Sequence, residues 1–190
     1  MEERWTKKNV IWMVILAILY VITTVIVCVL GSVYPIMFVC YQITAGVLIT
    51  GVVTKAFSLI KAPGVACCLS FAMVLTFFAI QDASIWHVVP LIVIAVLAEI
   101  VRVVGKYGRV GDMIAAVIMT FSTFGFYGQI WLNRDFTYES AIEEMPEGYG
   151  DALMAVSPAW ALPVVILIGV VLSLLFVNIT RKLFKLEYAG

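Results

Sequence analysis

Aromatic and polar side chains stand near the ends of several long apolar runs, and this is the combination that small-molecule pockets use. The candidates for substrate binding are Tyr34, Trp86, His87, Tyr127, Gln129, Trp131, Arg134, Tyr138 and Trp160. Tyr41 and Gln42 stand near the same ends. Each aromatic residue alone is also typical of an anchor at the bilayer interface, and His87 alone is typical of a hydrogen-bonded interfacial histidine. Their convergence favours a binding site.

Glu99 is an acidic residue inside an apolar run, and Arg102 follows three residues later on the same helical face. Ionised groups at such a depth are unfavourable unless they are paired or hydrated. The spacing therefore favours a structural ion pair between Glu99 and Arg102. The alternative is that Glu99 relays protons or cations.

Residue types that carry catalysis or hold a metal ion do not occur at the required spacing. Cys67 and Cys68 are adjacent and lack the two-residue gap of a zinc or redox motif, and the sequence has a single histidine. No nucleophile and base pair or phosphate-binding loop is recognisable. We therefore expect no enzymatic activity, no metal site and no intrinsic cofactor, so that any ATP hydrolysis is the work of partner subunits.

The elements that position these residues are membrane-spanning helices. Hydrophobic residues make up 64% of the 190 residues and charged residues only 13%. Apolar runs of about 20 residues, the length that crosses a bilayer core, recur along the chain. The sequence thus predicts an all-α integral membrane protein, with residues 1–190 forming one membrane domain of six transmembrane helices. The expected spans are 10–30, 34–53, 64–80, 85–104, 113–132 and 157–178.

Basic residues fall almost entirely on one set of alternating links. Of the 12 Lys and Arg residues, only Arg134 belongs to the other set. The others are Arg4, Lys7, Lys8, Lys55, Lys61, Arg102, Lys106, Arg109, Arg181, Lys182 and Lys185. Because basic residues near span ends stay in the cytoplasm, we expect both termini inside (N-in, C-in). The formal net charge of zero gives no support for nucleic-acid binding.

Segment 133–156, between the fifth and sixth spans, is the one long polar link, and this topology puts it outside. Its apolar residues follow helical spacing on both sides of the tripeptide 146–148 (PEG). Two short amphipathic helices with a hinge would form an outer lid over the span ends. The alternative is a solvated connector that rests on the bilayer surface.

Four stretches carry, by their order and spacing, a resemblance to a known family. They are 16–20 (LAILY), 97–100 (LAEI), 124–131 (FGFYGQIW) and 157–160 (SPAW). Over nearly its whole length the chain resembles an S component, the substrate-binding subunit of an energy-coupling factor (ECF) transporter, in the Trep_Strep or MptD-like family. The resemblance implies a multi-pass protein of a prokaryotic plasma membrane. Such a subunit captures a micronutrient outside and delivers it with a T component and two cytoplasmic ATPases of an ABC-type importer.

The resemblance also implies how the partner docks and what the cargo is. Small residues of the first span contact the T component, here Ala17, Val21 and Thr24, with Val21 in place of the second alanine of an Ala-x-x-x-Ala pattern. The cargo is vitamin-like, haem or iron-related. His87, Tyr127, Met145 or Met154 could supply an axial ligand for haem iron, whereas an acidic lid with only Arg134 would hold two propionates poorly.

Other functions are also compatible with these residues. The main alternative is a stand-alone proton-coupled permease for a small solute that uses Glu99. An intramembrane enzyme and an assembly scaffold are two more, and the first of these lacks a recognisable catalytic pair.

Overall fold

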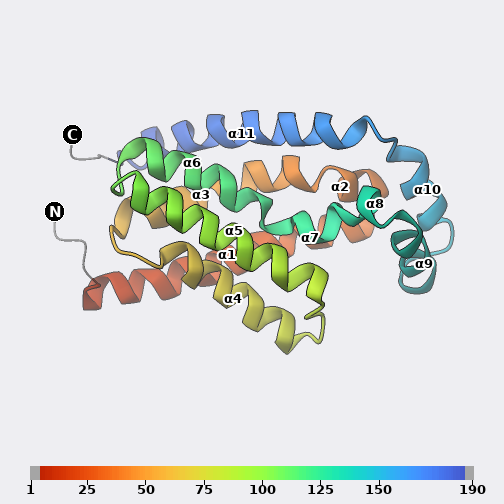
Figure 1. Cartoon of the computed structure of the whole chain (residues 1–190), viewed down its shortest axis with the longest axis horizontal. Coiled ribbons are helices and arrows are strands. Elements are labelled where there is room, and N and C mark those ends of the chain that lie inside the picture. Colours follow the sequence, from red (N-terminus) through yellow and green to blue (C-terminus); the bar gives the residue numbers. More distant parts are fainter. Residues whose placement is uncertain (1–4, 187–190) are drawn as a thin grey trace.

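Helices are the only regular secondary structure in residues 5–186, the part of the chain that the computed structural model describes (Figure 1). Arg4, which was counted for the orientation, lies outside these residues. In chain order the helices are α1 (Lys7–Val33), α2 (Pro35–Val39), α3 (Tyr41–Leu59), α4 (Val65–Ala79), α5 (Ile85–Val104), α6 (Arg109–Met119), the 3-10 helix η1 (Thr120–Thr123), α7 (Phe124–Tyr127), α8 (Gln129–Leu132), α9 (Arg134–Glu144), α10 (Tyr149–Val156) and α11 (Ala161–Leu183).

The long helices form a bundle, and the short helices α9 and α10 lie together at one end of it (Figure 1). The start of α1, the α3–α4 link, the α5–α6 link and the end of α11 lie at the opposite end (Figure 1). These are the segments whose basic residues the sequence assigns to a common side. α3 is central, since it packs against α1, α6 and α11.

Five helical segments among residues 5–186 are long and apolar enough to cross a membrane: α1, α3, α5, the run Arg109–Tyr127 and α11. The remaining expected span, 64–80, is α4, an apolar helix of only 15 residues. At a rise of about 1.5 Å per residue it is shorter than a bilayer core of about 30 Å. By length and composition, residues 5–186 therefore contain five candidate full-length spans and one shorter apolar helix.

The expected span 34–53 differs from the structure in two ways. It is divided into α2 and α3 at Cys40, and α3 continues to Leu59. Phe57 and Ile60 are fully buried. The segment that follows residue 53 is therefore the buried last part of a spanning helix.

The last two expected spans, 113–132 and 157–178, also differ from the helices in the structure. Span 113–132 is divided among α6, η1, α7 and α8. A Cβ at Gly125 would collide with the carbonyl oxygen of Trp86, so the backbone of α7 packs directly on the start of α5. The final helix begins at Ala161 instead of 157, and Ser157 does not cap it, since its hydroxyl donates a hydrogen bond of 2.7 Å back to the carbonyl of Leu153 in α10.

A buried arginine joins elements at the end of the bundle opposite α9 and α10. Arg102 is fully buried and lies 3.4 Å from Glu99, the partner that the sequence indicates. It lies 3.1 Å from Asp112 in α6, and Lys61 in the α3–α4 link pairs with the same carboxylate. Glu99 also accepts a hydrogen bond of 3.0 Å from the Ala66 amide of α4. The cluster balances two cations with two carboxylates.

Two glycines allow α3 and α11 to approach closely. A Cβ at Gly46 would lie 2.6 Å from the carbonyl oxygen of Gly169, and a Cβ at Gly169 would lie 2.6 Å from that of Gln42. Within a membrane, helix association relies on close van der Waals packing, which small residues permit. The contact between α3 and α11 therefore depends on glycine, which has no side chain, at positions 46 and 169.

We expect Gly46→Ala to lower the free energy of unfolding by about 1–3 kcal/mol, because the added methyl group overpacks against a backbone carbonyl. Gly51→Ala is the matched control in the same helix, since a Cβ there would meet only the Thr180 hydroxyl at 3.5 Å, an ordinary contact. Unfolding of the full chain in mixed micelles with increasing SDS, followed by circular dichroism, measures both variants. Equal losses in the two would contradict this role of Gly46.

Candidate ligand-binding cavity

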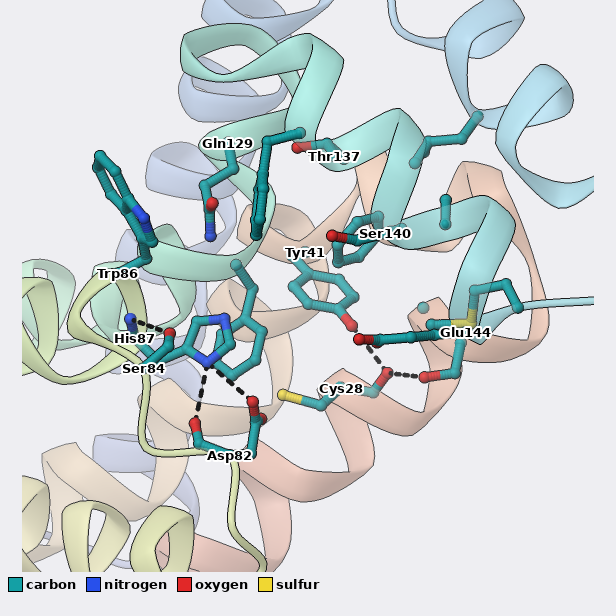
Figure 2. A pocket seen from close by; sticks show the side chains of 18 of the residues that line it. Cys28, Tyr41, Asp82, Ser84, Trp86, His87, Gln129, Thr137, Ser140 and Glu144 are labelled. Atoms are coloured by element: carbon teal, nitrogen blue, oxygen red, sulfur yellow. Dashed lines mark hydrogen bonds and ion pairs between the residues drawn. The ribbon is translucent and has the colours of Figure 1, made fainter.

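A cavity of about 460 Å³ lies between the pair α9 and α10, here named the roof, and the body of the bundle (Figure 2). Ligand pockets in proteins occupy about 300–1,000 Å³. The walls come from the end of α1, the α2–α3 segment, the α4–α5 link, the start of α5 and the α7–α8 segment. The lining side chains that carry oxygen or nitrogen are Ser32, Tyr41, Asp82, Ser84, Trp86, His87, Gln129, Thr137, Ser140, Glu144 and Tyr149.

The roof consists of two short helices separated by a break at residues 145–148, as the apolar spacing predicts. Gly148 has a φ of +80°, a conformation that favours glycine, so the chain can reverse there. Tyr138 in α9 donates a hydrogen bond of 2.8 Å to the Asp151 carboxylate in α10. This bond ties the two roof helices to each other.

Other contacts hold the roof on the bundle. The Tyr149 hydroxyl donates to the Gly31 carbonyl in α1. Burial raises the pKa of Tyr149 to about 12, so the hydroxyl keeps the proton of this bond near neutral pH. At the base of the roof, the Arg134 guanidinium donates to the carbonyls of Met154 at 2.9 Å and Ser157 at 3.0 Å. Buried apolar residues of the roof, namely Ala141, Tyr149 and Leu153, also pack it onto the core of the bundle.

His87 is oriented in the wall by Asp82. Its Nδ1 lies 3.1 Å from the Asp82 carboxylate and 3.1 Å from the Asp82 carbonyl, and Figure 2 shows both contacts. The imidazole ring stacks on Phe126 with a centroid distance of 3.7 Å. Ser84 caps α5 by accepting the His87 amide at 3.3 Å, so backbone and ring are both fixed. Because Nδ1 faces two oxygen acceptors, the neutral ring carries its proton there and offers Nε2 as an acceptor.

Tyr41 contributes an aromatic face beside α1. Its hydroxyl donates a hydrogen bond of 2.7 Å to the Cys28 carbonyl, and its ring meets Phe38 edge to face at 4.8 Å. A Cβ at Gly31 would collide with the Tyr41 ring, so this close approach requires glycine. The ring is therefore held rigidly at the cavity wall.

Gln129 lines the cavity and holds a buried acceptor without a partner. It is only 8% exposed, and its Nε2 donates a hydrogen bond of 2.7 Å to the Gly125 carbonyl. Its Oε1 has no hydrogen-bond partner within residues 5–186. A buried amide oxygen without a partner is unfavourable, and a ligand that donates a hydrogen bond would remove this penalty.

Three of the nine residues that the sequence proposes for substrate binding line the cavity, namely Trp86, His87 and Gln129. Arg134 and Tyr138 instead fasten the roof, and Trp131 donates its indole N–H to the Pro158 carbonyl at 3.0 Å. Tyr34 is 60% exposed and Trp160 67% exposed, and neither lines the cavity. These two stand at helix ends and point away from the bundle interior, as interfacial anchors do.

Tyr127 also lies outside the cavity lining, because it belongs to a buried polar network. Its hydroxyl donates a hydrogen bond of 2.9 Å to Gln42, whose amide donates to Thr120 at 3.0 Å. Ser173 of α11 lies 3.4 Å from the same Thr120 hydroxyl. The network joins α3, η1, α7 and α11, so Tyr127 stabilises the bundle beneath the cavity.

The proposed docking residues of α1 face inward. Thr24 is 1% exposed and its hydroxyl donates to the Tyr20 carbonyl at 2.8 Å, so it is not available to a partner. Ala17 and Val21 are partly buried and pack against the core. Thr24 therefore packs on the bundle interior, and the contact of Ala17, Val21 and Thr24 with a T component stays a prediction.

Four lining residues that were not assigned to the site matter most for its chemistry. Asp82 and Glu144 are its two acidic groups, and Tyr41 and Tyr149 are aromatic. Asp82 stands alone between two apolar runs, and Tyr149 belongs to the periodic pattern of segment 133–156, so both left a signal in the sequence. Nothing in the local pattern separates Glu144 from its acidic neighbours.

Comparisons with known proteins concern the membrane domain as a whole. The chain matches, over residues 7–186, the model of a family described as "Hypothetical bacterial integral membrane protein (Trep_Strep)". No curated protein and no solved structure matches it. Within the described residues, no group of three or more His, Cys, Asp or Glu side chains could hold a metal ion.

We expect Tyr149→Phe to increase hydrogen exchange of the α10 amides about fivefold, because it removes one buried hydrogen bond worth about 1 kcal/mol between the roof and α1. Hydrogen exchange with mass spectrometry on the protein in nanodiscs measures this opening. Tyr138→Phe is the control, since its bond joins α9 to α10 and not to α1. Unchanged exchange in Tyr149→Phe would show that the tether does not limit opening.

Proposed function

Because the chain belongs to the Trep_Strep family of bacterial integral membrane proteins, we propose that it is the substrate-binding subunit, or S component, of an ECF-type importer. In this proposal the cavity captures a small micronutrient at the outer face. A membrane T component and two cytoplasmic ATPases then drive delivery. The single observation that supports the proposal most is the cavity of about 460 Å³ beneath a tethered two-helix roof.

The proposed orientation has both termini in the cytoplasm and the roof outside. The distribution of basic residues supports it, because the two ends of the described chain and the α3–α4 and α5–α6 links lie together, away from the roof (Figure 1). In this arrangement there are six spans. The third is the short helix α4, and α6, η1, α7 and α8 together form the fifth. The roof helices α9 and α10 are then the outer lid of the cavity.

A second argument concerns Glu99, the group on which independent transport would depend. A stand-alone permease would need an ionisable group that can change its partners during a cycle. Glu99 is the candidate, yet it is held by Arg102 and by the Ala66 amide. These fixed contacts favour a structural role, and they support the subunit proposal over a proton-coupled permease.

We expect affinity purification of the tagged full chain from its native membrane to recover a T component and two ATPases. Liposomes with the complete complex are expected to accumulate the ligand when supplied with ATP. The chain alone is expected to bind the ligand without accumulating it, because it has no recognisable ATP-binding sequence. The readouts are mass spectrometry of the purified complex and uptake assays on both liposome preparations. Robust uptake by the chain alone would contradict the proposal.

Glu99→Gln separates the two transport readings. Gln retains an acceptor for the Ala66 amide, and Arg102 keeps its Asp112 partner, so we expect ligand binding and ATP-driven uptake within about twofold of wild type, with a loss of stability of about 1 kcal/mol. Loss of uptake with intact ligand binding would instead favour proton coupling through Glu99. Uptake at several pH gradients, together with unfolding in SDS, measures both effects.

A further inference from the structure

We infer that the cavity selects a small organic cation that carries N–H donors and an apolar or aromatic portion. This inference rests on the proposed function and names the substrate class of the same cavity. It comes from three independent properties of the lining: its charge, its balance of hydrogen-bond donors and acceptors, and its aromatic surface.

The charge of the lining is negative. Asp82 and Glu144 are its acidic residues, and none of the described lining residues is lysine or arginine. Figure 2 shows Asp82 with His87 on one side of the pocket and Glu144 with Ser140 and Thr137 on another. Arg134, the basic residue of the roof, donates to two backbone carbonyls and lines a separate shallow pocket. An anionic ligand would therefore find no countercharge in this cavity.

Several hydrogen-bond donors of the lining are already in use. The hydroxyls of Ser32, Tyr41, Thr137 and Tyr149 and the amide nitrogen of Gln129 each donate to a backbone carbonyl. The neutral donors left for a ligand are the Trp86 indole N–H and the hydroxyls of Ser84 and Ser140. A carboxylate or a phosphate would therefore meet a few neutral donors but no cationic one.

The lining also carries acceptors. The exposed Glu144 carboxylate forms no hydrogen bond or ion pair with any residue between 5 and 186, and Gln129 Oε1 is buried in the wall without a partner. In its neutral form with the proton on Nδ1, which faces Asp82, His87 adds Nε2 as a lone-pair acceptor. An ammonium, amidinium or guanidinium group would meet these acceptors with charge-assisted hydrogen bonds.

The remaining lining is aromatic. Phe38, Tyr41, Trp86, Phe126, Phe136 and Tyr149 surround the polar groups. Aromatic faces attract cations through their quadrupole and also bury apolar surface of the ligand. Haem fits this lining poorly, because its two propionates require basic partners that the cavity lacks. The aromatic surface and the acceptors together describe a cationic, partly apolar nutrient.

The test uses the full chain in lipid nanodiscs and a small-molecule extract of bacterial cells, separated by ion exchange into cationic, neutral and anionic fractions. Equilibrium dialysis against each fraction, followed by mass spectrometry, identifies the compounds that the protein retains. We expect retention from the cationic fraction only. Glu144→Gln is expected to weaken it about tenfold, because it removes one charge-assisted hydrogen bond, and Glu144→Lys is expected to weaken it further. Thermal unfolding of each variant checks that it is folded.

Glu143→Gln and Glu143→Lys are the matched controls, because Glu143 stands next to Glu144 in the last turn of α9 and does not line the cavity. They are expected to retain the cation as wild type does. Retention from the anionic or neutral fraction instead would overturn the cation inference and leave the capture function intact. If substitutions at Glu143 and at Glu144 weaken retention of the cation equally, the assignment of the cation to this cavity would be overturned. No retention from any fraction would count against the capture function, and the inference would fall with it.

Discussion

The fully buried guanidinium of Arg102 is the constraint on which the arrangement of the bundle depends. An isolated buried cation is strongly unfavourable, so every nearby element has to supply an acceptor. The acceptors come from the Glu99 and Asp112 side chains and from the carbonyls of Ile60 and Ala62. One residue therefore fixes the position of α5, α6 and the α3–α4 link relative to one another. Removal of one of these partners would leave the buried charge with fewer acceptors, so the cost depends on which of them remain.

The two ends of the bundle are consequently built in different ways. At the Arg102 end, charges neutralise each other and the polar atoms of the cluster are paired. Burial lowers the pKa of Lys61, and its contact with Asp112 acts in the opposite direction, so the pair is strongly desolvated. At the roof end the fifth expected span is broken into short helices, and the roof is held by hydrogen bonds such as that of Tyr149 and by the packing of Leu153 in the core.

The sequence pattern predicts those features of the structure that depend on residues close together in the chain. The expected span 85–104 coincides with α5 (Ile85–Val104), and the Glu99–Arg102 spacing gives a true ion pair because both residues share one helix. The cavity could not be assembled in this way, since Tyr41 and Glu144 meet only through the tertiary fold. The burial of Thr24 could not be predicted because several sides of α1 are apolar, and hydropathy does not reveal which of them packs inward.

The position of the two carboxylates relates the proposed ligand class to the roof. Asp82 belongs to the α4–α5 link of the bundle body, whereas Glu144 is the last residue of α9, just before the break at residues 145–148. A cation that contacts both would join roof and body, and it would do so only when the roof is closed. A ligand shifts a conformational equilibrium only by its difference in affinity for the two states. A cation held between these groups supplies that difference, because opening the roof withdraws one of its countercharges. An anion would gain nothing from closure, so the charge that selects the ligand also favours its retention.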